Sequence, residues 1–310
     1  MSGNKTEPLV SVIINCYNGD KFLRQAIDSV CSQTYKNWEI IFWDNCSSDK
    51  SADIAKEYGD RLKYFRAEIN TPLGHARNLA MQKANGEFIA FLDVDDIWYP
   101  DKLSLQINEI LTDNDYCICY SGVEEVLEDE THFRYYIPGY KSGYLINQLL
   151  ENFNIHIVAA LIRKSCLEES NMKFDEHLTA SEEYCLFINL SLMYPIAVVN
   201  QPLVKYRVSM NSLTSRMSDK LGYERRYSLE LLKTKQHFSN KVNIQKFKKA
   251  YLHSYYYDAK YHVTIGNRWK AINCMIKTQL SDIKHIFLFF ILFLPLSAWK
   301  KVHMYYRNRH

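Results

Sequence analysis

Three aspartates within four residues are the side chains best suited to chemistry. Asp93, Asp95 and Asp96 directly follow the apolar run 88–92, and a run of that kind predicts a buried strand. Carboxylate oxygens are hard ligands that suit a divalent cation, Mn²⁺ or Mg²⁺, which keeps open positions for diphosphate oxygens. Aspartate is also common in turns, so the preceding strand is what favours a ligand site here.

A fourth carboxylate, Asp44, directly follows another predicted strand, 38–43. Its fixed acceptor oxygens could take an N–H from a nucleobase, a contact that favours uracil or another base with a ring N–H. A turn or capping role is the alternative for this residue.

The segments around these residues alternate between two periodicities. Strands are predicted at 9–15, 38–43, 62–65 and 88–92, and helices at 20–33, 52–58 and 75–84. Such alternation predicts an α/β fold with a mostly parallel sheet and helices on its faces. Ligands of these folds bind beyond the carboxyl ends of the strands, so we expect residues 15–18, 44–45 and 93–96 along one edge.

Beyond residue 121 the pattern changes twice. A hairpin near 131–138 and helices near 144–151 and 182–192 predict an α+β completion of the same domain. After residue 216 the strand signals stop, and residues 223–237 and 244–280 have the pattern of amphipathic helices. We therefore predict a catalytic domain over 1–215, a helical appendage over 216–285 and a distinct segment over 286–310.

The last segment combines apolar and basic residues. Ile286–Leu296 is a run of eleven apolar residues, whereas a spanning helix needs about twenty. Trp299, Lys300 and Arg307 follow, together with other aromatic and basic residues and no acidic one. This pattern predicts a helix that lies in an anionic membrane surface. A buried helix of the appendage is the alternative.

Composition argues against two classes of protein. The 310 residues carry 38 Lys+Arg and 35 Asp+Glu, a formal net charge of +3, so the chain lacks the signature of a nucleic-acid binder. At 47% hydrophobic and 24% charged residues it is not largely disordered. The eight cysteines form no C-x-x-C pair and the N-terminus resembles no secretory signal, so we expect free buried thiols and a cytoplasmic location.

Five segments, taken in order and spacing, resemble one protein family. They are residues 11–18, 26–35, 44–49, 76–78 and 86–96. Over roughly residues 9–215 the chain resembles a family 2 glycosyltransferase with the GT-A fold. The resemblance implies an inverting transfer of a sugar from a nucleotide-sugar donor, assisted by a divalent metal.

The resemblance also implies roles for the residues that follow the strands. Tyr17 and Asp44 would hold the nucleobase, with Asn18 in the same nucleotide-sugar site. Asp93 would bind the ribose, and Asp95 would bind the metal.

Three further residues complete the implied donor site. Arg77 would approach the diphosphate or the aspartate cluster, a role that suits a fixed guanidinium. Asp96 would be an auxiliary acceptor near the metal or the sugar. Arg207 belongs to a segment that can close over the diphosphate.

An acidic pair, Glu182 and Glu183, supplies the candidate general base. Members of the family often carry Glu-Asp here, and the second carboxylate accepts the proton of the attacking acceptor hydroxyl. Glu183 matches that second position and Glu182 is the rival. The alternative is a pair that only stabilises the start of a helix through its dipole.

Three positions depart from the family pattern. Asn15 stands where Pro is usual, and Asn45 and Cys46 stand where Asp-Gly is usual. Many relatives also have a His metal ligand where this chain has Ser209 and Met210. We expect a perturbed base pocket and a metal site with one protein ligand missing or replaced.

Together these patterns predict a peripheral glycosyltransferase on the cytoplasmic face of a membrane, which moves one sugar from a UDP-sugar to a lipid-linked or surface-glycan acceptor. A nucleotidyltransferase is one alternative, but it would need a glycine-rich loop after the first strand, where residues 15–20 offer only Gly19. A non-catalytic protein that binds sugar nucleotides or glycans is the other. The sugar, the linkage and the oligomeric state leave no signal in the sequence.

Overall fold

The computed structural model describes residues 7–208, 217–280 and 283–292. Backbone contacts group the chain into two compact units. The first, here called the sheet unit, comprises Met1–Leu145, Asn154–His177 and Met193–Ser209, and the second, the helical unit, comprises Ile146–Phe153, Leu178–Leu192 and Met210–His310. The domain boundary expected near residue 215 stays a prediction.

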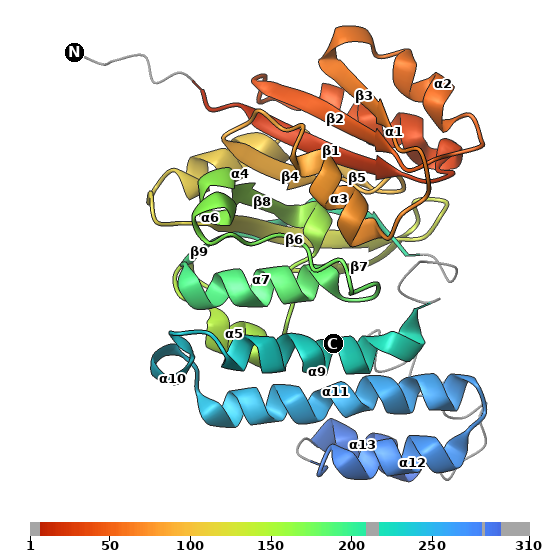
Figure 1. Ribbon diagram of the computed structural model, residues 1–310, viewed down its shortest axis with the longest axis vertical. Helices are drawn as coiled ribbons and strands as arrows, with labels where there is room; N and C mark the ends of the chain where they lie inside the picture. Colours follow the sequence, from red (N-terminus) through yellow and green to blue (C-terminus); the bar gives the residue numbers. More distant parts are fainter. Residues whose placement is uncertain (1–6, 209–216, 281–282, 293–310) are drawn as a thin grey trace. The chain divides into compact units, whose positions relative to one another are not determined.

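The sheet unit is built on a nine-stranded sheet in the order β3-β2-β1-β4-β8-β6-β9-β5, with β7 paired to β6 (Figure 1). The strands are β1 Val10–Cys16, β2 Trp38–Asp44, β3 Leu62–Arg66, β4 Phe88–Phe91, β5 Ile97–Trp98, β6 Ile118–Val126, β7 His132–Tyr136, β8 Ala160–Arg163 and β9 Ile196–Arg207. All four strands predicted in the first half of the chain are present, and β6 with β7 forms the predicted hairpin.

Strands β3, β2, β1 and β4 are mutually parallel. The crossovers carry helices α1 (Asp20–Cys31), α2 (Ser51–Lys56) and α3 (Leu73–Met81), as the alternation predicted. Strands β1, β2 and β4 are buried almost throughout, as expected of strands covered on both faces. The register pairs Cys16 with Asp44, so the polar residues after β1 and β2 begin at the same level along the strand direction.

The rest of the sheet is mixed rather than parallel. Strand β8 is antiparallel to β4 and β6, and β5 is antiparallel to β9, whereas β6 and β9 run parallel. These pairings involve segments beyond β4, most of them in the part of the sequence that predicted α+β completion. Helices α4 (Lys102–Ile110) and α6 (Lys164–Glu169) also belong to the sheet unit.

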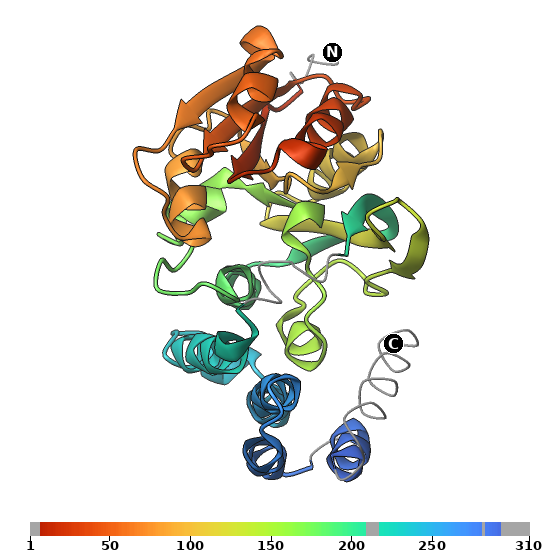
Figure 2. The ribbon, with the colours of Figure 1, turned by 90° about the vertical axis from the view of Figure 1, so that its right-hand side faces the viewer.

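The helical unit contains α5 Ile146–Glu151, α7 Glu182–Met193, α9 Ser218–Lys233, α10 Phe238–Lys241, α11 Ile244–Thr264, α12 Arg268–Lys277 and α13 Ile283–Ile291. Helices α9, α11 and α12 lie side by side (Figure 2). Asn243 caps α11 by accepting hydrogen bonds from the amides of Gln245 and Lys246, and such caps satisfy the free amides of a first turn. The predicted helical appendage is therefore present.

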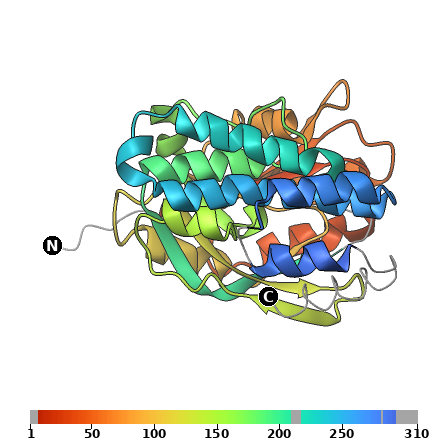
Figure 3. The ribbon, with the colours of Figure 1, turned by 90° about the horizontal axis from the view of Figure 1, so that it is seen from below.

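Helices α11, α12 and α13, whose ribbons are drawn in Figure 3, share a small apolar core. Its buried side chains are Ala259, Val263, Ala271, Met275, Ile291 and Leu292. None of the helices that the structure describes is long and apolar enough to cross a membrane. Of the predicted membrane segment 286–310, only residues up to 292 lie within the described part of the chain.

Candidate active site

The loop after β1 is fastened to the loop after β2. The Asn18 Oδ1 accepts a hydrogen bond of 2.8 Å from the Ser48 amide, and the Asn18 amide donates one of 3.0 Å to Ser47 Oγ. Asn18 has a φ of 53°, a left-handed conformation that asparagine tolerates better than most residues. Tyr17 next to it is 56% exposed. The structure therefore leaves Tyr17 available to a ligand, while the Asn18 side chain is engaged in holding the loop.

The Asp44 side chain is fully buried and already holds three donors. Its oxygens accept hydrogen bonds from the Ser47 amide (2.7 Å), the Tyr64 hydroxyl (2.5 Å) and the Arg66 guanidinium (2.7 Å). A carboxylate offers about four acceptor positions, so these three donors leave about one for a nucleobase, and Arg66 beside it is 46% exposed. The role of Asp44 in base binding stays a prediction. Tyr64 and Arg66 are partners that the sequence analysis did not identify.

The family departures at Asn45 and Cys46 have visible consequences. Asn45 binds Thr71 through three hydrogen bonds, with Nδ2 donating to the Thr71 carbonyl and Oδ1 accepting from the Thr71 amide and hydroxyl. Cys46 has a φ of 70°, a conformation that a non-glycine residue adopts at a steric cost. Glycine at this position would adopt that conformation freely.

Arg77 lies beside the aspartate cluster. Its guanidinium donates a hydrogen bond of 3.4 Å to Asp93 Oδ1, and its side chain is only 3% exposed. The guanidinium carbon lies 6.0 Å from the Phe91 ring centre and 5.5 Å from that of Phe174. Packing of this kind holds the charge in one place. The approach to the aspartates agrees with one of the two positions implied for Arg77, and contact with a diphosphate stays a prediction.

Asn78, from the same helix, holds a neighbouring loop. Its side chain donates to the Phe174 carbonyl at 2.9 Å and to Glu176 Oε1 at 3.0 Å, and it accepts from the Phe174 amide at 3.0 Å. His75 adds a contact of 2.8 Å to Glu176. Hydrogen bonds from these two side chains and Lys173 lower the pKa of Glu176 to about 2. Helix α3, which carries Arg77, thus holds the loop at residues 174–176 in place.

Asp96 is buried at 1% exposure and Asp95 is partly buried. Burial, and secondarily the negative charge of Asp93, raises the pKa of Asp95 to about 6. Burial, followed by the charges of Asp95 and Asp93, raises the pKa of Asp96 well above its ordinary value. Asp96 Oδ1 accepts a hydrogen bond of 2.8 Å from the Arg207 amide. The turn therefore concentrates negative potential that a cation would relieve.

Arg207 closes this turn from β9. Its guanidinium donates to the Asp95 carbonyl, to Gln25 Oε1 at 2.8 Å and to Glu130 Oε1 at 3.3 Å. It also lies 4.1 Å from the Phe22 ring centre. The side chain is 2% exposed, so it supports the Asp95–Asp96 turn, and its predicted contact with the diphosphate would require a rearrangement. No sequence signal pointed to Gln25 or Glu130.

The loop after β1 and the turn after β4 touch at Gly19. A Cβ atom placed on Gly19 would lie 2.8 Å from Val94 Cγ2 and 3.1 Å from Cys16 Sγ. A Cβ atom at 2.8 Å would force Val94 to shift, so glycine permits the approach. The predicted edge is therefore continuous from Tyr17 to the aspartate turn.

The sequence model of Glycosyl transferase family 2 matches residues 11–170. The chain belongs to this family. A relative is the Escherichia coli enzyme UDP-Glc:alpha-D-GlcNAc-diphosphoundecaprenol beta-1,3-glucosyltransferase WfgD, 33% identical over 210 residues, which are 67% of this chain and 80% of the relative. The protein is therefore a glycosyltransferase, as the five segments predicted.

Two solved structures share the GT-A fold of this glycosyltransferase. A fragment of Staphylococcus aureus TarS in complex with UDP-GlcNAc matches with a TM-score of 0.67 and 17% identity, covering 97% of this chain and 92% of that one. The mannosyltransferase PcManGT from Pyrobaculum calidifontis, in complex with GDP-Man and Mn²⁺, matches with a TM-score of 0.59 and 16% identity, covering 98% and 86%. At these identities the comparison shows the fold alone.

The donor atoms at the aspartate turn of this glycosyltransferase fit a divalent cation in part. Asp93 and Asp95 present hard carboxylate oxygens in a region of concentrated negative potential. Within the described ranges, no three His, Cys, Asp or Glu side chains are close enough to hold a metal unaided. A cation here would therefore take further oxygens from diphosphate and water. Ser209 and Met210, where relatives carry a His, lie outside the described residues.

Glu182 and Glu183 begin α7, as predicted. They belong to the helical unit. Glu182 is 5% exposed. Both occupy the first turn, where a negative charge interacts favourably with the helix dipole. Which of them is the base, and whether either is, stays a prediction.

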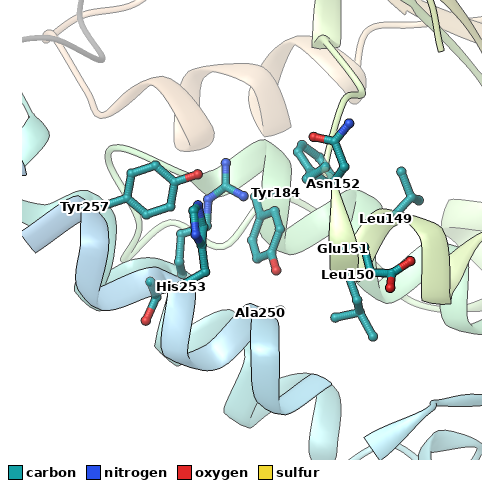
Figure 4. A pocket seen from close by; sticks show the side chains of 11 residues that line it. Leu149, Leu150, Glu151, Asn152, Tyr184, Ala250, His253 and Tyr257 are labelled. Carbon is teal, nitrogen blue, oxygen red and sulfur yellow. The ribbon is translucent and has the colours of Figure 1, made fainter. Parts of the chain in front are cut away.

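A cavity of about 80 Å³ lies in the helical unit among α5, α7, α9 and α11. Figure 4 shows Tyr184 of α7 together with His253 and Tyr257 of α11 around it. The Arg225 guanidinium of α9 lies 3.9 Å from the Tyr184 ring centre. This cation–π contact joins α9 to the residue that follows Glu183.

Proposed function

We propose that this glycosyltransferase is an inverting enzyme that transfers a single sugar from a UDP-sugar to a lipid-linked or surface-glycan acceptor. The observation that carries the proposal is the continuous edge from Tyr17 to Asp96, with Arg77 buried against Asp93. It offers an exposed aromatic ring, carboxylates and a fixed cation where α/β folds bind nucleotides.

Two comparisons support the choice of UDP and of the acceptor class. The name of the E. coli relative states UDP-Glc as its donor and a GlcNAc-diphosphoundecaprenol acceptor. TarS has been solved with UDP-GlcNAc. PcManGT binds GDP-Man, so GDP is the competing nucleotide. Family membership favours glycosyl transfer over the nucleotidyltransferase alternative, and a non-catalytic member remains the alternative that assays must exclude.

In the proposed reaction Glu183 removes the proton of an acceptor hydroxyl as its oxygen attacks the anomeric carbon. The new C–O bond forms while the bond from the anomeric carbon to the diphosphate oxygen breaks, so UDP leaves with the electron pair. Attack from the face opposite UDP inverts the anomeric configuration. Arg77, held beside Asp93, supplies positive potential toward the leaving diphosphate. A divalent cation held by Asp95 would supply further charge neutralisation.

Thermal unfolding with UDP, GDP, CMP and dTDP, each with and without Mn²⁺, tests the donor site. Ligand at about 100 times its dissociation constant stabilises a protein by roughly 2.7 kcal/mol, which corresponds to several degrees in Tm. We expect the largest rise in Tm with UDP and Mn²⁺ together. In Asp95→Ala, Mn²⁺ should add nothing to the rise in Tm that UDP causes. No shift with any nucleotide would contradict the donor site.

A transfer assay tests the reaction itself. UDP-glucose and UDP-GlcNAc are offered with a GlcNAc-diphospho-lipid, and product is identified by mass and anomeric NMR. We expect a single added sugar with inverted configuration, and its loss in Glu183→Gln. Retention of configuration, or full activity of Glu183→Gln, would refute the proposed mechanism.

We also propose that the protein docks on an anionic membrane through α12 and α13. Five large apolar side chains of these helices are exposed: Trp269, Ile276, Ile286, Phe287 and Phe290. The two helices contain no Asp or Glu, and Arg268, Lys270 and Lys277 are exposed on α12. Apolar side chains next to cations are the composition of a surface that binds anionic lipid. The proposed location is the cytoplasmic face.

A further inference from the structure

A buried carboxylate on α9 holds the segment that leads into α7. Glu224 is 3% exposed. Its Oε1 accepts hydrogen bonds from the Thr179 amide (2.9 Å) and hydroxyl (3.1 Å). Its Oε2 accepts from the Ala180 amide (2.8 Å), the Ser181 amide (2.9 Å) and the Ser181 hydroxyl (3.3 Å). Three consecutive backbone amides thus converge on one carboxylate.

These contacts fix the start of the helix that carries the candidate base. The Ser181 carbonyl accepts the hydrogen bond of the Cys185 amide at 3.1 Å, so Ser181 is the residue that caps the start of α7. Glu182 and Glu183 follow at once. Hydrogen bonds to a charged acceptor are about twice as strong as neutral ones, and burial increases their strength. The backbone before Glu183 is therefore held more firmly than an ordinary loop.

Arg225, the residue after Glu224 on α9, contacts the residue that follows Glu183. The Arg225 guanidinium lies 3.9 Å from the Tyr184 ring centre. It also lies 5.2 Å from the ring centre of Phe153 and 5.4 Å from that of Tyr257; Figure 4 shows Tyr184 and Tyr257 at the same cavity. Glu224 and Arg225 thus contact residues on both sides of the candidate base.

Helix α9 is itself anchored to α11, so it can serve as a support. Arg226 forms an ion pair of 2.8 Å with Asp258. A Cβ atom on Gly222 would lie 2.0 Å from Asp258 Oδ1, so the two helices meet closely there.

We propose that Glu224 is a positioning residue for Glu183. By binding the amides of residues 179–181 it holds the first turn of α7 in the arrangement in which Glu183 reaches the acceptor hydroxyl. The inference rests on the proposed function, in which Glu183 is the base. A general base must lie within about 2.6–3.2 Å of the oxygen whose proton it removes, or reach it through one water, and a displacement of about 1 Å can cost about 10²-fold in rate.

Glu224→Gln is the test, because its amide nitrogen would face amide donors in place of a carboxylate oxygen. The assay measures the release of UDP from UDP-glucose, once with a GlcNAc-diphospho-lipid as acceptor and once with water alone. We expect kcat to fall by roughly 10²-fold in both cases. UDP binding, measured by calorimetry, should not change, because the donor residues belong to the sheet unit. Glu224→Asp keeps the charge and should retain more activity than Glu224→Gln.

Controls separate positioning from general damage. Glu230→Gln changes an exposed carboxylate on the same helix that lies 3.8 Å from Lys233, and it should behave as wild type. In Glu183→Gln, adding Glu224→Gln should cause no further loss, because both act through one base. If Glu224→Gln fails to fold by circular dichroism, Glu224→Asp carries the same kcat comparison.

The outcomes distinguish this inference from the proposed function. Loss of transfer in Glu183→Gln with full activity in folded Glu224→Gln would overturn the positioning role alone. Full activity in Glu183→Gln, or no turnover by wild type, would overturn the proposed function and the inference with it. An equal loss of UDP binding and kcat in Glu224→Gln would also contradict positioning.

Discussion

The main-chain amide of Arg207 donates a hydrogen bond of 2.8 Å to the buried Oδ1 of Asp96. This bond ties the end of β9 to the aspartate turn after β4. In Asp96→Ala the amide would be left in the interior without a partner, at a cost of about 1–3 kcal/mol. Asp96→Asn keeps an oxygen acceptor and should lose much less.

Urea unfolding of the two variants beside wild type measures the difference. Equal destabilisation by Asn and Ala would show that the charge at position 96, rather than its acceptor oxygen, supports the turn. Full stability in Asp96→Ala would contradict the contact itself.

Replacing Cys46 by glycine should stabilise the protein. Cys46 holds a φ of 70°, and a left-handed non-glycine residue costs about 1–2 kcal/mol, partly offset by the greater freedom of glycine in the unfolded chain. We expect a gain of roughly 0.5–1 kcal/mol in the free energy of unfolding. Cys46→Ala removes the thiol without relieving the backbone, so it should show no gain. A gain in the alanine variant would attribute the effect to the thiol.

The first half of the sheet was predictable because its signals are local. Strand 38–44 is rich in apolar residues and buried at every position, and the helices between the strands have their own period. Strands β5 and β8 have two and four residues, too few for a periodicity, and their antiparallel pairing depends on chain segments far away in sequence. The mixed half of the sheet therefore left no such signal.

The candidate site was likewise predictable only in part. The carboxyl ends of β1, β2 and β4 brought Tyr17, Asp44 and Asp93 to one edge, as parallel strands must. The partners that hold these groups were not predictable, because they come from distant segments: Glu130 binds Arg207, 77 residues away, and Glu224 binds Ser181, 43 residues away. Neither acidic residue lies in a motif, so no local pattern distinguishes it from a surface glutamate.

Lys102 predicts a pH-dependent stability. Its side chain is fully buried, with Nζ 3.9 Å from the Trp98 ring centre and 2.8 Å from Gln106 Oε1. Burial lowers the pKa of Lys102 to about 7 from an ordinary value of 10.5. The unfolded chain therefore binds one more proton between pH 7 and 10.5, so this residue's penalty on folding is greatest near pH 7 and below and shrinks as the pH rises.

Lys102→Met should remove that penalty. We expect the variant to be more stable than wild type at pH 7 by an amount on the order of 1–3 kcal/mol, because the lost donor to Gln106 offsets part of the gain. The difference should shrink at pH 9.5. Urea unfolding of both proteins at the two pH values measures it, and a difference independent of pH would refute a titrating Lys102.

The proposed membrane surface predicts binding that depends on lipid charge. Trp269 is 79% exposed and Phe290 is 65% exposed. An apolar side chain inserts into the bilayer interface, and each nearby cation adds about 1 kcal/mol on an anionic surface. We expect the protein to sediment with vesicles containing phosphatidylglycerol more strongly than with pure phosphatidylcholine, and to be released by salt.

The double variant Trp269→Ser and Phe290→Ser should lose most of this binding while its transfer to a detergent-dispersed acceptor is unchanged. Ile244→Ser is the matched control, because Ile244 is 59% exposed but lies at the start of α11. It should bind vesicles as wild type does. Equal loss in the control would indicate nonspecific adsorption, and full binding by the double variant would exclude α12 and α13 as the docking surface.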